Sequence, residues 1–251
     1  MEKRKILAAY SWKYEGDWGL IRRAIANEED PVSFTSPDAY LTIFDENYPA
    51  CLKQLKYPPW VLWYQGDIRL LERPMATIVG SRKMDDYGKD CTRLVAGILR
   101  KQYVLVSGLA RGVDACVHET ALENGHTIGV IGNGLSIHYP KENDRLYRRL
   151  SRTDLILSEY PSRTGVKRYH FPWRNRILAA LGKVIIVTEA EEKSGTMLTV
   201  NEALELNKDV CCFPYPYGND LGKGCNRLIA EGAQIIWDRS QLEDLCRKWS
   251  C

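Results

Sequence analysis

Residues 103–131 read YVLVSGLARGVDACVHETALENGHTIGVI, and they contain a strand–helix–strand pattern. Residues 103–107 and 127–131 are short β-rich runs, and a helical pattern at 112–124 separates them. The apolar residues of these strands are continuous instead of alternating with polar ones, which is typical of strands buried on both faces. Such a unit favours two parallel strands connected by a helix. This stretch therefore predicts an α/β fold.

The same alternation extends from residue 75 to the C-terminus. Strands are expected at 76–80, 103–107, 127–131, 154–159, 183–189, 209–213 and 234–237. Helices are expected at 87–101, 112–124, 141–150, 172–181, 195–207, 226–232 and 240–249. We predict a mostly parallel sheet with helices on both faces, and ligands at the carboxyl ends of its strands.

Residues 1–74 differ in character from the rest of the chain. They are rich in tryptophan and contain the turn-rich run Tyr57-Pro58-Pro59-Trp60. A helix at 16–27 and a strand at 61–64 are expected there. We predict that 1–74 form a small N-terminal extension packed on a main domain of residues 75–251.

The amino-acid composition limits the classes of protein to which this chain can belong. The 251 residues are 45% hydrophobic, as in a folded globular chain, and no apolar run approaches the roughly 20 residues that span a bilayer. The sequence therefore predicts a cytoplasmic protein without membrane contact. None of the eight cysteines forms a C-x-x-C pair, so neither a structural zinc site nor any other metal or cofactor is expected.

A basic and aromatic run gives the first functional signal. No acidic residue occurs between Glu159 and Glu189, whereas residues 163–183 contain six Arg or Lys side chains among Tyr169, Phe171 and Trp173. Clustered cations attract phosphates, and neighbouring rings offer faces on which unpaired bases stack. The net charge of the chain is only +3, so such a surface must come from local clustering. The run predicts a site for single-stranded nucleic acid.

Four glycine-containing loops follow predicted strands. They are Gly80-Ser81-Arg82, Ser107-Gly108-Leu109-Ala110-Arg111-Gly112, Gly132-Asn133-Gly134 and Lys193-Ser194-Gly195-Thr196. Small residues let backbone N–H groups approach an anion, and a helix N-terminus adds partial positive charge. Each loop alone is equally well interpreted as an ordinary turn of a parallel sheet. Several on one edge, two of them carrying an arginine, favour phosphate binding.

The arginines of the predicted helix 172–181 allow two interpretations. Pro172 suits the first helical position, which places Arg174 and Arg176 in the opening turns. Cations there oppose the helix dipole, so a purely structural design would favour acidic residues instead. The alternative is that either arginine pairs with an internal carboxylate such as Glu159 or Glu189.

Five ordered motifs together resemble the DNA-processing protein A family, also called DprA or Smf. These motifs are Val79-Gly80-Ser81-Arg82, Ser107 to Asp114, His170 to Ala179, Ser194-Gly195-Thr196 and Gly224 to Ile229. The resemblance extends from about Leu41 to Trp237. It implies a Rossmann-like domain that binds single-stranded DNA, forms a homodimer and helps to load the RecA recombinase during natural transformation, without enzymatic activity.

The resemblance also implies which residues contact DNA. By motif position these are Arg82, Ser107, Gly108, Arg111, Arg168, Phe171, Arg174, Arg176, Lys193 and Ser194. Several of them are also members of the basic and aromatic run and of the glycine loops.

Two other classes of function remain open at this point. Related Rossmann-like phosphoribohydrolases place a glycine–threonine loop beside a glutamate, which Gly195-Thr196 with Glu189 or Glu202 could imitate. Their full proline–glycine–glycine signature is missing here. The other alternative is a nucleotide-sensing module that binds a small ligand instead of a strand.

Overall fold

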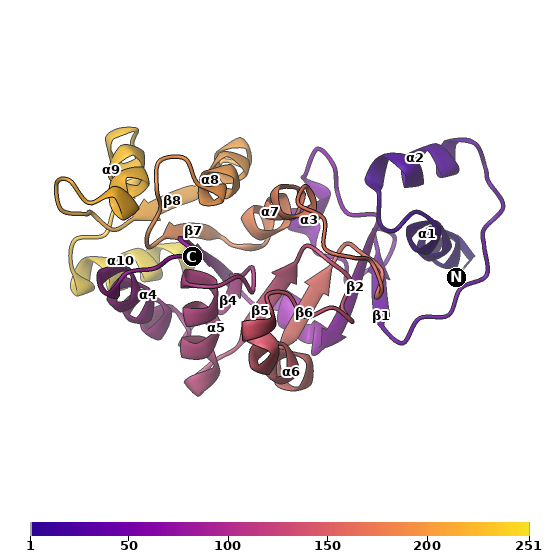
Figure 1. Ribbon diagram of the computed structural model, residues 1–251, viewed down its shortest axis with the longest axis horizontal. Coiled ribbons are helices and arrows are strands. Elements are labelled where there is room, and N and C mark those ends of the chain that lie inside the picture. Colours follow the sequence, from indigo (N-terminus) through magenta and orange to yellow (C-terminus); the bar gives the residue numbers. More distant parts are fainter. Residues whose placement is uncertain (1, 251) are drawn as a thin grey trace.

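The computed structural model describes residues 2–250, which form a nine-stranded sheet between two layers of helices (Figure 1). The strands lie side by side in the order β1-β2-β6-β5-β4-β3-β7-β8-β9. Their bounds are β1 Ala39–Thr42, β2 Val61–Gly66, β3 Met75–Val79, β4 Val104–Ser107, β5 Thr127–Ile131, β6 Leu155–Ser158, β7 Val184–Val187, β8 Asp209–Cys212 and β9 Gln234–Ile235. All pairs from β6 to β9 are parallel, so the predicted mostly parallel α/β fold is confirmed.

Ten α-helices are present within the described part of the chain. They are α1 Glu2–Lys13, α2 Trp18–Ala26, α3 Ala50–Lys53, α4 Asp86–Leu99, α5 Val113–Asn124, α6 Asp144–Thr153, α7 His170–Leu181, α8 Gly195–Glu205, α9 Lys223–Ala230 and α10 Arg239–Ser250. Three short 3₁₀ helices complete the set: η1 Ile68–Glu72, η2 Lys141–Asn143 and η3 Asp220–Gly222. Helix α4 packs beside α5, and α7 beside α8, on the two opposite faces of the sheet (Figure 1). Within residues 2–250, no helix is both long and apolar enough to cross a bilayer.

The sheet reverses its strand order at β3. From β3 the chain moves outward through β4, β5 and β6, and then returns to place β7 on the other side of β3. Ligands of open parallel sheets bind in the crevice that forms at such a point, beyond the carboxyl ends of the strands. The loops that follow β3 and β7 meet there, where the Ser81 N–H donates to the carbonyl of Glu189 at 2.8 Å.

The core explains the continuous apolar strands. Ile78, Val106, Ile128 and Ile186 lie on neighbouring central strands and are all fully buried. A helix layer covers each face of these strands, so no position along them faces water. This is the burial on both faces that the sequence pattern predicts.

Residues before β3 contribute to the same sheet. Strands β1 and β2 continue it as an antiparallel edge, with Trp63 of β2 opposite Ser158 of β6. Helix α1 packs against both strands, and its Leu7 and Tyr10 join Trp63 in a second apolar cluster. The division of the chain at residue 74 stays a prediction, but backbone hydrogen bonds connect the two parts.

Some element boundaries differ from the predicted ones. The predicted helix 172–181 begins at His170, so Pro172 is its third residue instead of its first. Proline is tolerated there because no N–H of the first turn has a partner within the helix. Helix α9 begins at Lys223 and not at 226, and the sequence reading missed α1, β1 and α3.

Candidate nucleic-acid interface

A hollow of about 710 Å³ lies at the reversal point of the sheet. Its walls come from the loop after β3, the first turns of α7, and the loop from β7 into α8. We call it the basic hollow, because five basic and two acidic side chains line it. These are Arg82, Lys83, Arg168, Arg174 and Lys193, opposed by Asp114 and Glu191.

The structure brings six of the ten predicted contact residues together in this lining. They are Arg82, Arg168, Phe171, Arg174, Lys193 and Ser194. The side chains of Arg82, Arg168 and Lys193 are exposed, as is that of Lys83. None of these four cations forms an ion pair with any carboxylate of residues 3–249. Their charge is therefore available to an anion from outside.

An aromatic surface accompanies these cations. The guanidinium of Arg82 lies 5.7 Å from the centre of the Phe171 ring, within the range of a cation–π contact. The ring of Tyr139 lies 5.7 Å from the Phe171 ring at an interplanar angle of 40°. Phe171 is partly buried and Tyr139 is exposed, so both rings border solvent as well as each other.

Arg174 forms the floor of the basic hollow. Its side chain is 4% exposed, and its Nη1 donates to the carbonyl of Val130. Burial lowers the pKa of Arg174, and the nearby Asp114 carboxylate opposes that shift. Burial likewise raises the pKa of Asp114, and Arg174 opposes it in turn. The alternative pairing of Arg174 with Glu159 or Glu189 is not what the structure shows, since its acidic neighbour is Asp114.

Two buried polar atoms in the lining have no hydrogen-bond partner among the described residues. They are Nε of Arg174 and Oγ of Ser194. Ser194 directly precedes the first residue of α8, and its hydroxyl does not cap that helix. The leading N–H groups of a helix point outward along its axis and carry partial positive charge. Both orphan atoms are buried and belong to residues that line the basic hollow.

Ser107 and Gly108 lie beneath the hollow instead of in its lining. The hydroxyl of Ser107 is fully buried and donates to the carbonyl of Ile78 at 2.7 Å. A Cβ at Gly108 would overlap the Arg174 guanidinium and stand 2.6 Å from Oδ2 of Asp114. Position 108 therefore needs glycine because the floor of the hollow touches its backbone.

The two remaining predicted residues lie elsewhere. Arg111 is exposed and forms an ion pair with Glu142. Arg176 is buried, and its Nη2 lies 2.6 Å from Oε1 of the buried Glu159. Neither arginine therefore lines the basic hollow, and Arg176 takes the internal pairing that was its alternative interpretation. DNA contact by any of the ten residues stays a prediction.

Sequence reasoning missed several members of the lining. Lys83 directly follows the motif Gly80-Ser81-Arg82, so its charge was visible in the sequence. Asn175 donates to the carbonyl of Gly195 at 3.2 Å and thereby connects α7 to the start of α8. Thr196 donates to the carbonyl of Gly80 at 3.1 Å and joins the loops after β7 and β3. These contacts depend on pairs of residues far apart in the chain, so no local pattern marks them.

The glutamates of the enzymatic alternative lie outside the basic hollow. Glu189 accepts a hydrogen bond from the Asp85 N–H at 3.1 Å and another from the Tyr215 hydroxyl at 3.3 Å. Burial raises the pKa of Glu189 to about 7. Neither Glu189 nor Glu202 belongs to the lining. The carboxylates that the enzymatic alternative requires are therefore not part of the lining of the basic hollow.

The chain is similar to proteins of one family. The family model described as DNA recombination-mediator protein A matches residues 39–249. DNA processing protein DprA of Streptococcus pneumoniae is 40% identical over 196 residues, which is 78% of this chain and 70% of that protein. Protein Smf of Synechocystis is 40% identical over 209 residues, 81% of this chain and 52% of that protein. The chain therefore spans only part of these relatives.

Two solved structures share the fold. The structure of DNA processing protein A from Streptococcus pneumoniae has a TM-score of 0.80 at 35% identity and covers 89% of this chain and 80% of its own. That of DNA processing protein A from Helicobacter pylori has a TM-score of 0.76 at 32% identity, covering 86% and 99%. The Helicobacter structure is described as addressing a single-stranded DNA binding mode.

Proposed function

Because the chain belongs to the DNA recombination-mediator protein A family, we propose that it is a recombination mediator that binds single-stranded DNA in the basic hollow. One observation carries the proposal: four exposed cations without ion-pair partners line the same hollow as the partly exposed ring of Phe171. Unpaired cations neutralise phosphates, and an accessible ring stacks on an unpaired base. The single-stranded DNA binding mode of the Helicobacter relative supports this choice of ligand.

Each group in the hollow has a distinct part in the proposed complex. The exposed Arg82, Arg168 and Lys193 bind phosphates and make the affinity depend on salt. The first N–H groups of α8 and the orphan hydroxyl of Ser194 hold one phosphate at the floor. Arg174 supplies a buried positive charge beneath it, and a low local dielectric strengthens that attraction.

The proposed preference for single-stranded DNA follows from the ring of Phe171. Stacking on Phe171 requires a base that is not already stacked and paired within a duplex. Base–aromatic stacking is worth about 1–3 kcal/mol per base. Arg82 lies 5.7 Å from the centre of the same ring and adds a cation beside the base.

The wider functional assignments are proposals that rest on family membership. They comprise a binding role without catalysis, homodimer formation, help in loading RecA during natural transformation, and action in the cytoplasm. A dimer would present two basic hollows to one strand, which raises the overall affinity through effective concentration.

Fluorescence anisotropy with oligo(dT) and with a matched duplex, each at several salt concentrations, tests the proposal. We expect stronger binding of the single strand and a steep loss of affinity with salt. Arg82→Ala should weaken binding and reduce the salt slope by about one unit. Arg152→Ala is the matched control, because Arg152 is exposed on α6 and lies outside the hollow. Equal affinity for both forms of DNA, or an affinity independent of salt, would contradict the proposal.

A further inference from the structure

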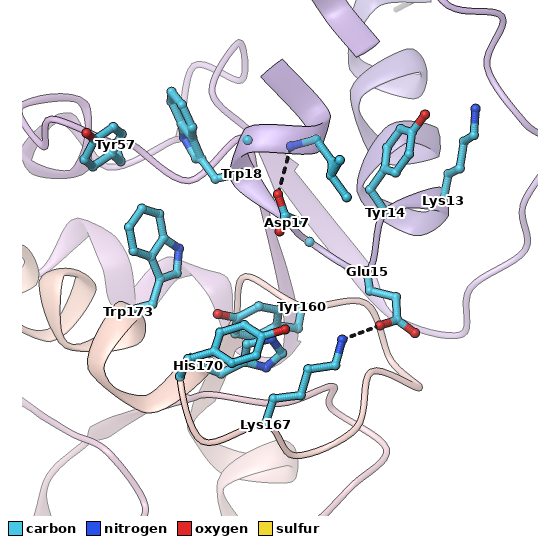
Figure 2. A pocket seen from close by; sticks show the side chains of 14 residues that line it. Lys13, Tyr14, Glu15, Asp17, Trp18, Tyr57, Tyr160, Lys167, His170 and Trp173 are labelled. Atoms are coloured by element: carbon cyan, nitrogen blue, oxygen red, sulfur yellow. Dashed lines mark hydrogen bonds and ion pairs between the residues drawn. The ribbon is translucent and has the colours of Figure 1, made fainter. Parts of the chain in front are cut away.

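A second hollow, of about 820 Å³, lies on the other side of the start of α7. Six Tyr or Trp side chains line it: Tyr14, Trp18, Tyr57, Tyr160, Tyr169 and Trp173. We call it the aromatic hollow. Figure 2 shows Trp18 projecting from α2 and Trp173 projecting from α7. The rings of Tyr160 and His170 overlap in this view and lie beside Trp173. So many rings around one space provide stacking faces for flat, unsaturated groups.

The rings of this hollow are held in place before any ligand arrives. Trp18 stacks on Trp60 with ring centres 5.4 Å apart, and its Nε1 donates to the carbonyl of Pro58 at 2.8 Å. Tyr160 and His170 stack at 3.8 Å, and Nδ1 of His170 lies 3.1 Å from the carbonyl oxygen of Gly132. A ligand therefore meets ordered faces, which reduces the entropy lost on binding.

The two hollows share one wall, the N-terminal end of α7 with the residues before it. Residues that are neighbours in the sequence line opposite sides of that wall. Arg168, Phe171 and Arg174 line the basic hollow, whereas Lys167, His170 and Trp173 line the aromatic one. Tyr169 also lines the aromatic hollow, and its side chain is 64% exposed beside Arg168. A flexible polymer leaving the basic hollow at Arg168 thus reaches aromatic rings immediately.

Charge at the aromatic hollow favours an uncharged aromatic group. Lys167 is paired with Glu15 at 2.7 Å, and Lys13 with Glu29 at 2.9 Å (Figure 2 shows the first pair). Asp17 accepts from the Leu20 N–H at 2.8 Å and caps α2. These lysines are therefore less available for phosphates than those of the basic hollow. The carboxylates are likewise engaged, which disfavours an organic cation as occupant.

We propose that the aromatic hollow takes unpaired bases of the same DNA strand whose phosphates bind in the basic hollow. This inference rests on the proposed function and extends it to a second subsite. The strand crosses the end of α7 at Arg168 and Tyr169, and its bases turn toward Trp18 and Trp173. Phosphates stay on the basic side, because that is where the unpaired cations lie.

The test uses the full chain and two lengths of oligo(dT), a short one that fills only the basic hollow and a longer one. We expect the longer strand to bind more tightly and Tyr169→Ala to weaken it about five-fold or more, as expected for one lost stacking contact. Tyr169→Ala should leave the short strand and the salt slope unchanged. Tyr217→Ala is the matched control, since Tyr217 is fully exposed and belongs to neither hollow.

A second measurement locates the bases of the bound strand relative to the two hollows. The fluorescent base 2-aminopurine, moved along the longer strand, should be quenched at positions beyond the basic hollow, and Tyr169→Ala and Trp18→Leu should restore its emission. If the short strand binds and depends on Arg82 but no further position is quenched, this inference is overturned and the proposed function stands. If neither strand binds, both this inference and the proposed function are overturned. Equal affinity for thymidine monophosphate and for the longer strand would also overturn the inference that one strand continues from the basic hollow into the aromatic hollow.

Discussion

Nη2 of Arg176 lies 2.6 Å from Oε1 of Glu159, and both side chains are almost completely buried. The same guanidinium donates to the backbone carbonyls of Tyr57 at 3.0 Å and Trp173 at 2.7 Å. Its three nitrogens thus join α7, the strand-end residue Glu159 and the loop before β2. Arg176 therefore connects the N-terminal part of the chain to the sheet.

Replacing Arg176 with alanine should destabilise the protein without removing a DNA contact. Loss of one partner leaves Glu159 buried without its counter-ion, which typically costs about 3–5 kcal/mol. Urea unfolding should show this loss, while the salt slope of DNA binding by the folded variant stays that of the parent. Arg111→Ala is the control: it breaks an exposed pair and should change stability by less than about 1 kcal/mol. A reduced salt slope for Arg176→Ala would contradict the structural role.

Arg168 and Arg174 should respond differently to the same substitution. Arg168→Ala removes an exposed cation, so affinity for oligo(dT) should fall and the salt slope decrease by about one unit, with little change in stability. Arg174→Ala should lower both affinity and stability, because it leaves Asp114 buried without its cation. Anisotropy titrations and urea unfolding of both variants separate the two effects. Equal stability of the variants would show that Arg174 has no structural part.

Gly108→Ala should impair binding even though Gly108 does not line the hollow. The added Cβ would overlap the Arg174 guanidinium, so Arg174 and Asp114 must move. We expect weaker oligo(dT) binding and lower stability, by about 1–3 kcal/mol. Gly97→Ala is the control, since nothing lies within 4 Å of a Cβ there and α4 gains a better helix former. If Gly108→Ala bound oligo(dT) with the parental affinity, this would contradict the proposal that Arg174 at the floor of the basic hollow contributes to binding.

Phe171→Leu should weaken single-strand binding at every salt concentration by a similar factor. Leucine keeps an apolar contact but loses the stacking face, which is worth about 1–3 kcal/mol for one base. The salt slope should not change, because no cation is removed. Phe44→Leu changes an exposed phenylalanine outside the hollow and serves as control. Unchanged affinity in Phe171→Leu would show that no base stacks there.

Glu189 should make stability depend on pH. Burial raises its pKa in the folded state to about 7, from an ordinary value of 4.5. The folded state then binds more protons than the unfolded state between these values, so the contribution of Glu189 to stability falls as pH rises from about 4.5 to about 7. Glu189→Gln removes this contribution, and its stability relative to the parent should increase over that range in urea unfolding. A constant difference between the two proteins would contradict the raised pKa.

The sequence alone determined the sheet and predicted the chemistry of a ligand. Strands such as 127–131 specify burial on both faces, because Ile128 and Val130 place apolar side chains on one face and Ile131 places one on the other. The absence of acidic residues from 160 to 188 indicated an anionic ligand, since local charge can be counted without coordinates. Motif position also indicated Arg82, Phe171 and Lys193, which the structure brings into one hollow.

Only the tertiary structure separated the arginines by their surroundings. Arg174 and Arg176 stand two residues apart on α7, which places them on different sides of a helix that turns about 100° per residue. One therefore faces Asp114 under the basic hollow, and the other faces Glu159 in the core. The aromatic hollow likewise combines Tyr14 and Trp18 with Tyr169 and Trp173, which are remote in sequence. Such pairings depend on how helices pack across the sheet, and no local pattern encodes them.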